Sequence, residues 1–193
     1  KVGSITGYSP EIGIVKDTAC SAFLSPRHSS WGWGTWKKVW DSIDWSDVDY
    51  KFEVAKTPKR HFFNEGGWDL AKMLKLQSKG KINSWSIQFD FHCWQRSLYC
   101  VTSFQNFIHH TGIDKNASHF SNLDKYNPFS GYSGTYDRNP PAKVEIEWQS
   151  LNVDKQIFKL VRSYYNKRYL LIILLSIIKL ITKFFGSANA RKT

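Results

Sequence analysis

Asp69 is the carboxylate whose surroundings point most directly to chemistry. It follows Gly66, Gly67 and Trp68, and the residues after it recur at helical spacing. The side chain is therefore expected in the first turn of a helix, where the positive end of the helix dipole stabilises a carboxylate. Such an Asp is commonly a simple helix-terminal charge, but a carboxylate at the lip of a pocket can also serve as a general base. Both roles remain open from the residues alone.

A second group is the Trp-Gly loop, which runs from Ser29 to Trp36 and reads Ser-Ser-Trp-Gly-Trp-Gly-Thr-Trp. The chain contains nine Trp, and each buried indole N–H needs a hydrogen-bond partner. Flat aromatic rings also stack on the apolar faces of pyranose sugars, and Gly beside Trp lets the backbone approach a ligand. A sugar-binding loop and a Trp-rich core are the two interpretations. The candidate sugar-binding residues are Ser30, Trp31, Gly32, Trp33, Gly34 and the nearby Trp68.

A third group combines His109, His110, Asp114 and His119. Imidazole and carboxylate both suit divalent ions, but this spacing matches no standard zinc pattern, so solvated loop histidines are the simpler interpretation. The chain has three Cys and no Cys-x-x-Cys motif. An odd number of Cys without such a motif is no disulfide framework and indicates reduced thiols in a cytosolic setting.

The charge is distributed unevenly along the 193 residues, whose formal net charge is +11. Residues 1–150 carry 18 basic and 15 acidic side chains, whereas residues 151–193 carry nine and one. Phosphate binding needs clustered Lys and Arg on the binding surface, so the nearly balanced body disfavours a nucleic-acid partner. The positive charge instead accompanies an almost wholly apolar stretch, Tyr169–Phe185.

That stretch has 17 residues, fewer than the roughly 20 that a membrane-spanning helix needs. A basic approach followed by an apolar helix is typical of an anchor on an anionic membrane surface. The alternatives are a helix that packs on the domain, or a tilted span whose Lys side chains reach back to the interface.

Periodicity predicts a mixed α/β fold with a coarse division into a body, 1–150, and a basic amphipathic tail, 151–193. Apolar residues at helical spacing predict helices, whereas alternation predicts strands. Helices are expected over 35–43, over 68–78 and from 152 onward; strands or extended segments over 2–8, 84–91, 99–108 and 144–148; and a long loop over 114–137.

Several segments together carry a family resemblance. They are Val2–Tyr8, Ser29–Trp36 with Trp40, Phe63–Leu74 and Gly80–Ile87, with a looser match from Gly112 to His119. In order and spacing they resemble bacterial family 2 glycosyltransferases with the GT-A nucleotide-sugar fold. The resemblance implies that residues 1–150 are the acceptor-side half of the catalytic domain, the C-terminal portion of a GT-A fold with a mixed sheet. The nucleotide-binding half and its acidic metal motif would precede Val2.

The resemblance also implies roles for individual residues. Asp69 corresponds to the catalytic base, the Trp-Gly loop lines the sugar site, and His119 corresponds to a metal ligand. The cofactor is a divalent metal, Mn²⁺ or Mg²⁺, held mainly by the missing half. One departure is Trp68, because related sequences often have two adjacent acids after the Gly-Gly pair.

The function expected from this resemblance is an inverting transfer from a nucleotide-sugar donor to a glycan or lipid-linked acceptor, in cell-surface polysaccharide synthesis. The protein is expected to be cytoplasmic and peripheral at the inner face of the cell membrane, with the tail on the membrane surface. The isolated chain is expected to be inactive, because half of the nucleotide site is missing. The alternative is a non-catalytic carbohydrate-binding module or a degenerate transferase.

Overall fold

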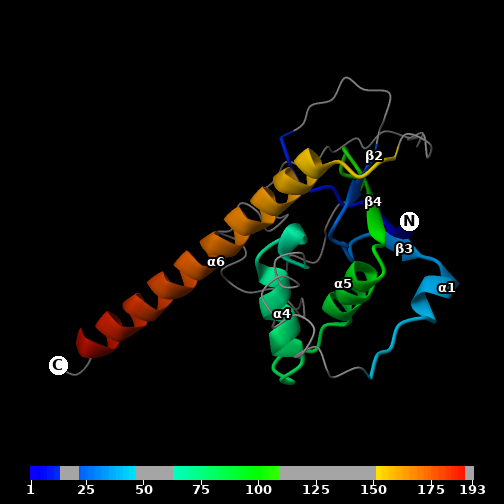
Figure 1. The fold of residues 1–193 in the computed structure, drawn as a ribbon. Coiled ribbons are helices and arrows are strands. Elements are labelled where there is room, and N and C mark those ends of the chain that lie inside the picture. Colours follow the sequence, from blue (N-terminus) through cyan, green and yellow to red (C-terminus); the bar gives the residue numbers. More distant parts are fainter. Residues whose placement is uncertain (14–21, 47–62, 109–150, 190–193) are drawn as a thin grey trace. The chain divides into compact units, whose positions relative to one another are not determined.

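The computed structural model describes residues 1–13, 22–46, 63–108 and 151–189, and the fold is mixed α/β (Figure 1). Its strands are β1 (Val2–Thr6), β2 (Ala22–Ser25), β3 (Trp33–Thr35) and β4 (Tyr99–Ser103). Its α-helices are α1 (Lys37–Trp40), α4 (Asp69–Gln77), α5 (Trp85–Gln95) and α6 (Lys155–Asn189), and a 3₁₀ turn, η1 (Asn64–Gly66), precedes α4.

The four strands form one mixed sheet in the order β2-β4-β1-β3. The central strands β1 and β4 are parallel, and the outer strands pair with them antiparallel. Val101 of β4 lies opposite both Ile5 and Leu24, at the middle of the sheet. The apolar residues Ala22, Leu24 and Val101 are buried together there. The predicted strand over 2–8 is confirmed, and β4 forms the first half of the extended segment predicted over 99–108.

Helix α4 confirms the prediction over 68–78. Leu70 and Leu74 are almost fully buried, as the helical spacing requires. The helix is followed by Gly80 with a positive φ of 64°, and the N–H of Lys81 donates to the carbonyl of Leu76 at 2.9 Å. This backbone arrangement is a common helix ending that favours glycine.

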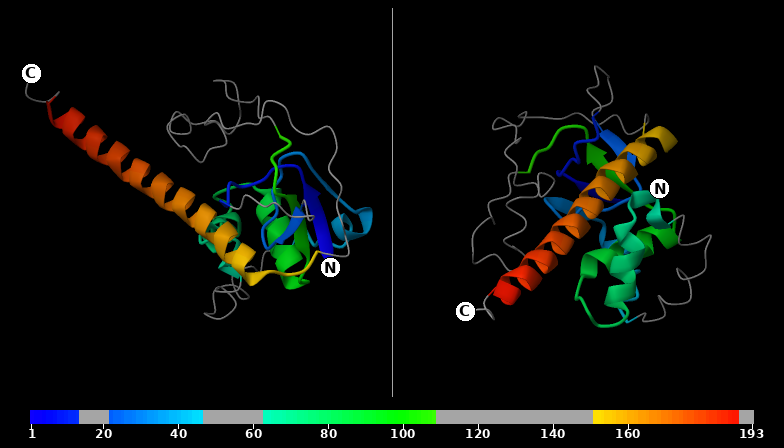
Figure 2. Two further views of the ribbon diagram at one scale, coloured as in Figure 1. Left: turned by 90° about the horizontal axis from the view of Figure 1, so that it is seen from above. Right: turned by 90° about the vertical axis from the view of Figure 1, so that its left-hand side faces the viewer.

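The strand predicted over 84–91 is wrong, because this segment is helix α5. The helix lies side by side with α4 (Figures 1 and 2). Ile87 and Phe91 pack in one cluster with α4, whereas Phe89 and Cys93 pack in another with Ile43. Positions two apart are about 200° apart around a helix, so a helix buried between two clusters shows the alternation of a strand.

The helix predicted over 35–43 is shorter than expected, because α1 covers only Lys37–Trp40. Its first predicted residue belongs to β3, where Thr35 donates from its hydroxyl to the carbonyl of Gly3 at 2.6 Å. The loop predicted over 114–137 and the strand predicted over 144–148 lie outside the described residues.

The chain divides into two compact units, and the boundary falls within α6. The helix confirms the prediction from 152 onward, and its residues up to Tyr165 belong to the first unit. In that part Phe158, Val161 and Tyr164 are buried. The remaining residues of α6, from Asn166, belong to the second unit and expose large apolar side chains such as Leu174. Within the described ranges, none of the helices is long and apolar enough to cross a membrane.

Candidate functional site

Asp69 begins α4, and its carboxylate is held by Arg27, which follows β2. Nη1 of Arg27 donates to Oδ1 and Nη2 donates to Oδ2, both at 2.8 Å. The two side chains are only 13% and 18% exposed. The guanidinium carbon also lies 3.9 Å from the centre of the Tyr165 ring. Two parallel charge-assisted hydrogen bonds fix the orientation of a carboxylate more firmly than one, so Asp69 is a rigidly placed charge.

The glycine pair before α4 makes this ion pair possible. Gly67 has a φ of 139°, which side-chain-bearing residues rarely adopt. A Cβ at this position would stand 2.6 Å from Oδ1 of Asp69 and 2.9 Å from Nη1 of Arg27. The carbonyl oxygen of Gly66 accepts a further hydrogen bond from Arg27 at 3.3 Å. The Gly-Gly motif therefore provides the space in which the ion pair closes.

Burial and charge shift the ionisation of the residues around Arg27. Burial alone would lower the pKa of Arg27, but the Asp69 carboxylate outweighs it, so this pKa lies above its ordinary value. Burial raises the pKa of Asp90 to about 7, against the opposing effects of Arg27 and of the backbone N–H of His28. That N–H donates to Oδ1 of Asp90 at 2.7 Å. Asp90 therefore changes charge close to neutral pH.

His28 is neutral and buried beside the sheet. Burial lowers its pKa to about 3, and Arg27 adds to the effect. Its Nδ1 lies 3.2 Å from the hydroxyl of Ser4, whereas Nε2 has no hydrogen-bond partner among the described residues. The ring packs against Trp33 and Phe89, each with a centroid distance of 4.6 Å. Asp90 accepts from the backbone of His28 and not from its ring, so Ser4, His28 and Asp90 do not form a nucleophilic triad.

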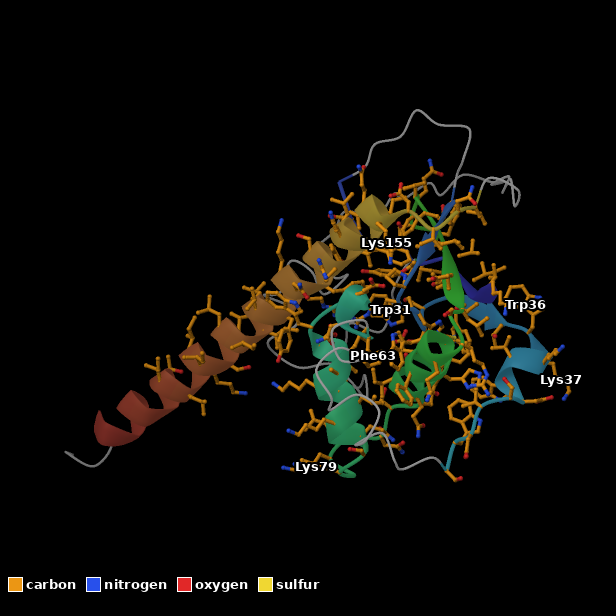
Figure 3. The ribbon with its side chains drawn as sticks, viewed as in Figure 1. Trp31, Trp36, Lys37, Phe63, Lys79 and Lys155 are labelled. Atoms are coloured by element: carbon orange, nitrogen blue, oxygen red, sulfur yellow. The ribbon has the colours of Figure 1, made fainter. Side chains whose placement is uncertain are left out.

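The Trp-Gly loop divides between two aromatic clusters. Trp31, labelled in Figure 3, meets the ring of Tyr8 edge to face at 4.9 Å. Gly32 follows with a positive φ of 53°. Trp33 then stacks on Trp85 of α5 with a centroid distance of 5.0 Å. The Trp-rich core interpretation therefore applies to Trp33, which joins a packed cluster, whereas Trp31 lies in a separate contact with Tyr8. The sugar-binding interpretation stays a prediction.

Tyrosine side chains connect the Trp-Gly loop with Asp69. The hydroxyls of Tyr8 and Tyr164 are 2.9 Å apart, and Tyr164 meets the ring of Tyr165 edge to face at 5.1 Å. Tyr165 in turn covers the guanidinium of Arg27. The contacts thus run through Trp31, Tyr8, Tyr164, Tyr165, Arg27 and Asp69.

The other predicted site residues are less closely associated with Asp69. Trp68 is 49% exposed, Ser30 is half-buried, and Gly34 is exposed in β3 with no atom within 4 Å of a Cβ built there. His119 lies outside the described residues. Within the described ranges no group of three His, Cys, Asp or Glu side chains could hold a metal ion. The guanidinium of Arg27 lies 2.8 Å from both oxygens of Asp69, and its positive charge disfavours a metal cation at this carboxylate.

Sequence reasoning missed Arg27 and Asp90. Arg27 is 42 positions from Asp69 in the chain, and nothing in its local pattern marks it. Asp90 did carry a signal, because it is the one acidic residue within the apolar segment from Trp85 to Trp94. Comparison of the chain with protein-family models, curated proteins and solved structures gave no match.

Proposed function

We propose that the chain is the acceptor-side half of an inverting glycosyltransferase with a GT-A fold, in which Asp69 is the general base. The observation that carries the proposal is the Asp69 carboxylate, held by Arg27 at the start of α4 and linked by tyrosines to Trp31. The mixed sheet with flanking helices is compatible with such a fold. The sequence resemblance supplies the reaction class, and the geometry supplies a carboxylate whose orientation is set.

The chemical step follows from the position of that carboxylate. Each carboxylate oxygen has two lone pairs, so an oxygen that accepts from Arg27 can still accept a second proton donor. Asp69 removes the hydroxyl proton of the acceptor while the acceptor oxygen bonds to the anomeric carbon of the donor sugar. The bond from that carbon to the diphosphate breaks, and the nucleotide diphosphate leaves with the electron pair. Asp69 is left protonated and returns the proton to solvent.

The residues proposed to bind the metal and the nucleotide-sugar donor lie outside the described part of the chain. A divalent metal, Mn²⁺ or Mg²⁺, would supply charge that balances the departing diphosphate. Its candidate ligand in this chain is His119. Arg27 has a positioning role. It holds both oxygens of Asp69 and thereby sets the direction from which the carboxylate can accept the hydroxyl proton of the acceptor.

The test is Asp69→Asn in the complete protein, with donor binding and sugar transfer measured separately. Loss of a general base typically lowers the rate by about 10²–10⁴-fold, so transfer should fall in that range while donor binding persists. The control is Asp41→Asn, which removes an exposed carboxylate paired with Lys37 and should leave transfer unchanged. Transfer at the wild-type rate by folded Asp69→Asn would overturn the assignment.

A second candidate is a carbohydrate-binding module without catalysis. The observation that favours it is a group of half-exposed Trp rings from α1 and α5, including Trp40 and Trp85, which are 38% and 39% exposed. Under this alternative the complete protein would bind glycan and transfer no sugar from any nucleotide-sugar donor.

We further propose that the second half of α6 lies on an anionic membrane surface at the cytoplasmic face. Its exposed apolar residues include Leu170, Leu174 and Ile178, and basic residues such as Arg168 precede them. An apolar helix with adjacent positive charge is suited to such a surface. The test is flotation with vesicles of phosphatidylglycerol and phosphatidylcholine, comparing the protein with a truncation after Arg168 that retains Tyr165. Equal flotation of the two would contradict the proposal.

A further inference from the structure

The first part of α6 supplies an aromatic ring that covers Arg27. The guanidinium carbon of Arg27 lies over the ring of Tyr165, 3.9 Å from its centre. Tyr165 is 8% exposed and belongs to the same compact unit as Arg27 and Asp69. A cation over an aromatic face is attracted by the negative charge density of the ring, and the attraction is stronger where water is excluded. The contact therefore restrains a group that is already bonded to Asp69.

The hydrogen bonds of Arg27 restrain the guanidinium mainly within its own plane. Its N–H groups point outward in that plane, where they donate to both oxygens of Asp69 at 2.8 Å and to the carbonyl of Gly66 at 3.3 Å. A hydrogen bond weakens steeply only when its angle at the hydrogen falls below about 120°, so these bonds tolerate a tilt of the guanidinium out of its plane. A group on the face of the guanidinium opposes that tilt, and Tyr165 lies there.

Tyr165 is itself held in place by its neighbours. Its ring meets the ring of Tyr164 edge to face at 5.1 Å, and the hydroxyl of Tyr164 lies 2.9 Å from that of Tyr8. The backbone of Gly67 also lies close against Tyr165, because a Cβ built on this glycine would stand 3.0 Å from the Cβ of Tyr165. The position of the ring is therefore set by α6 and its packing, and the ring does not simply follow the guanidinium.

Other contacts dock the first part of α6 away from Arg27. Phe158, about two helical turns before Tyr165, is 3% exposed, and its ring centre is 5.6 Å from that of Tyr99 in β4. At the start of the helix, where Figure 3 labels Lys155, the Nζ atom of Lys155 lies 3.2 Å from Oε1 of Glu65. Because these contacts do not involve Arg27, the effect of Tyr165 on the ion pair can be separated from the docking of the helix.

We propose that Tyr165 is a positioning residue of the candidate site, which holds the guanidinium of Arg27 against tilting and thereby keeps the carboxylate of Asp69 in one orientation. The site is therefore complete only when the first part of α6 is docked. The restraint on Arg27 follows from the contacts, whereas its effect on catalysis rests on the proposed function, in which Asp69 is the base. A base must lie within reach of the proton that it removes, and a displacement of about 1 Å can lower a rate about 10²-fold.

The first test measures the rotation rate of the Arg27 guanidinium in the full chain by NMR exchange between its Nη signals, which are identified by their loss in Arg27→Lys. Tyr165→Leu should raise this rate about tenfold, in line with the attraction between a desolvated cation and a ring. Tyr165→Phe should restore slow rotation, because it keeps a ring over the guanidinium. Phe158→Leu is the matched control, since it removes a buried ring from the same helix, and should leave the rotation rate unchanged.

The second test measures sugar transfer by the complete protein. Tyr165→Leu should lower kcat about 10²-fold through displacement of the base, with little change in the KM for the donor, and Tyr165→Phe should recover most of that loss. Phe158→Leu should keep the kcat of the wild type. A loss of packing alone would affect Phe158→Leu as much as Tyr165→Leu, so this comparison separates positioning from stability.

The proposal is overturned if the guanidinium rotates as slowly in Tyr165→Leu as in the wild type, if Tyr165→Phe behaves like Tyr165→Leu, or if Phe158→Leu has the same effect. Tyr165→Met, whose flexible side chain fills irregular space without a ring, decides the question if Tyr165→Leu fails to fold. The NMR measurement needs neither donor nor acceptor. If the rotation rates change as expected while the complete protein transfers no sugar, the restraint on Arg27 is supported and the proposed function is wrong.

Discussion

Replacing Asp69 by Asn should destabilise the protein, apart from any effect on catalysis. The variant leaves the positive charge of Arg27, whose side chain is 13% exposed, without its carboxylate. Removing one partner of a buried ion pair costs about 3–5 kcal/mol. Asn keeps one acceptor oxygen for the guanidinium, so we expect the lower end, about 3 kcal/mol. For a chain of this length, 1 kcal/mol corresponds to roughly 2–4 °C in Tm, which gives a decrease of about 6–12 °C.

The assay is unfolding by heat and by urea, followed by circular dichroism at neutral pH. Asp41→Asn serves as the matched control, because its partner Lys37 is four residues away on an exposed surface. Such pairs contribute about 0.3–0.5 kcal/mol, so its Tm should change little. If Asp69→Asn and Asp41→Asn melt alike, the Arg27–Asp69 pair does not carry the stability assigned to it.

A double-mutant cycle tests the physical reason directly. Arg27→Met and Asp69→Leu each leave an uncompensated charge, whereas the double variant leaves none. The double variant should therefore lose less free energy of unfolding than the two single variants together, by more than about 1 kcal/mol. Additive losses would show that the two side chains stabilise the fold independently of each other.

Three further predictions concern the surroundings of this pair. The pKa of Asp90 is raised by burial from 3.8 to about 7, so its protonated form stabilises the fold below about pH 4 and this contribution is lost as pH rises through about 7. The free energy of unfolding of Asp90→Asn, measured with urea, should accordingly rise by about 3 kcal/mol relative to that of the wild type between about pH 4.5 and pH 8. A difference between the two proteins that does not change with pH would contradict the burial of a titrating carboxyl. Gly67→Ala should lower the free energy of unfolding by about 2 kcal/mol through strain, whereas Gly34→Ala, which meets no atom within 4 Å, should change it by less than about 0.5 kcal/mol; equal effects would refute the steric argument. Tyr164→Phe removes the 2.9 Å hydroxyl contact with Tyr8 and should cost about 1 kcal/mol in the same assay, and an unchanged midpoint would show that the contact is not stabilising.

Local periodicity predicted those elements whose burial is one-sided. Helix α4 buries Leu70 and Leu74 and leaves Lys72 and Lys75 exposed, so its sequence shows one apolar stripe. The same reasoning gave a wrong prediction for α5, because this helix is buried on two opposite sides. Apolar residues therefore occur at every second position, as at Ile87 and Phe89, which is the pattern of a strand. No local pattern distinguishes the two cases, since burial on a second side depends on which other elements pack there.

The candidate site likewise has features that the local sequence predicted and features that only the structure showed. The position of Asp69 at the start of a helix follows from the residues around it, whereas the need for glycine at position 67 became evident only from its φ of 139° in the structure. The pairing of Asp69 with Arg27 does not follow from the local sequence, because the two side chains come from segments 42 positions apart. The raised pKa of Asp90 is equally non-local, since it depends on burial and on residues such as Arg27 and His28 that are distant in the sequence.

The amino-acid sequence by itself therefore determined the α/β class, the helix that carries Asp69, the Trp-rich character and the basic, apolar C-terminal helix. These properties follow from composition and from hydrogen bonding between residues a few positions apart. Only the tertiary structure decided that Arg27 holds Asp69, that Trp31 and Trp33 join different clusters, and that Tyr165 of α6 covers the guanidinium of Arg27. Such choices depend on which distant side chains exclude water together, and that information is spread over the whole fold.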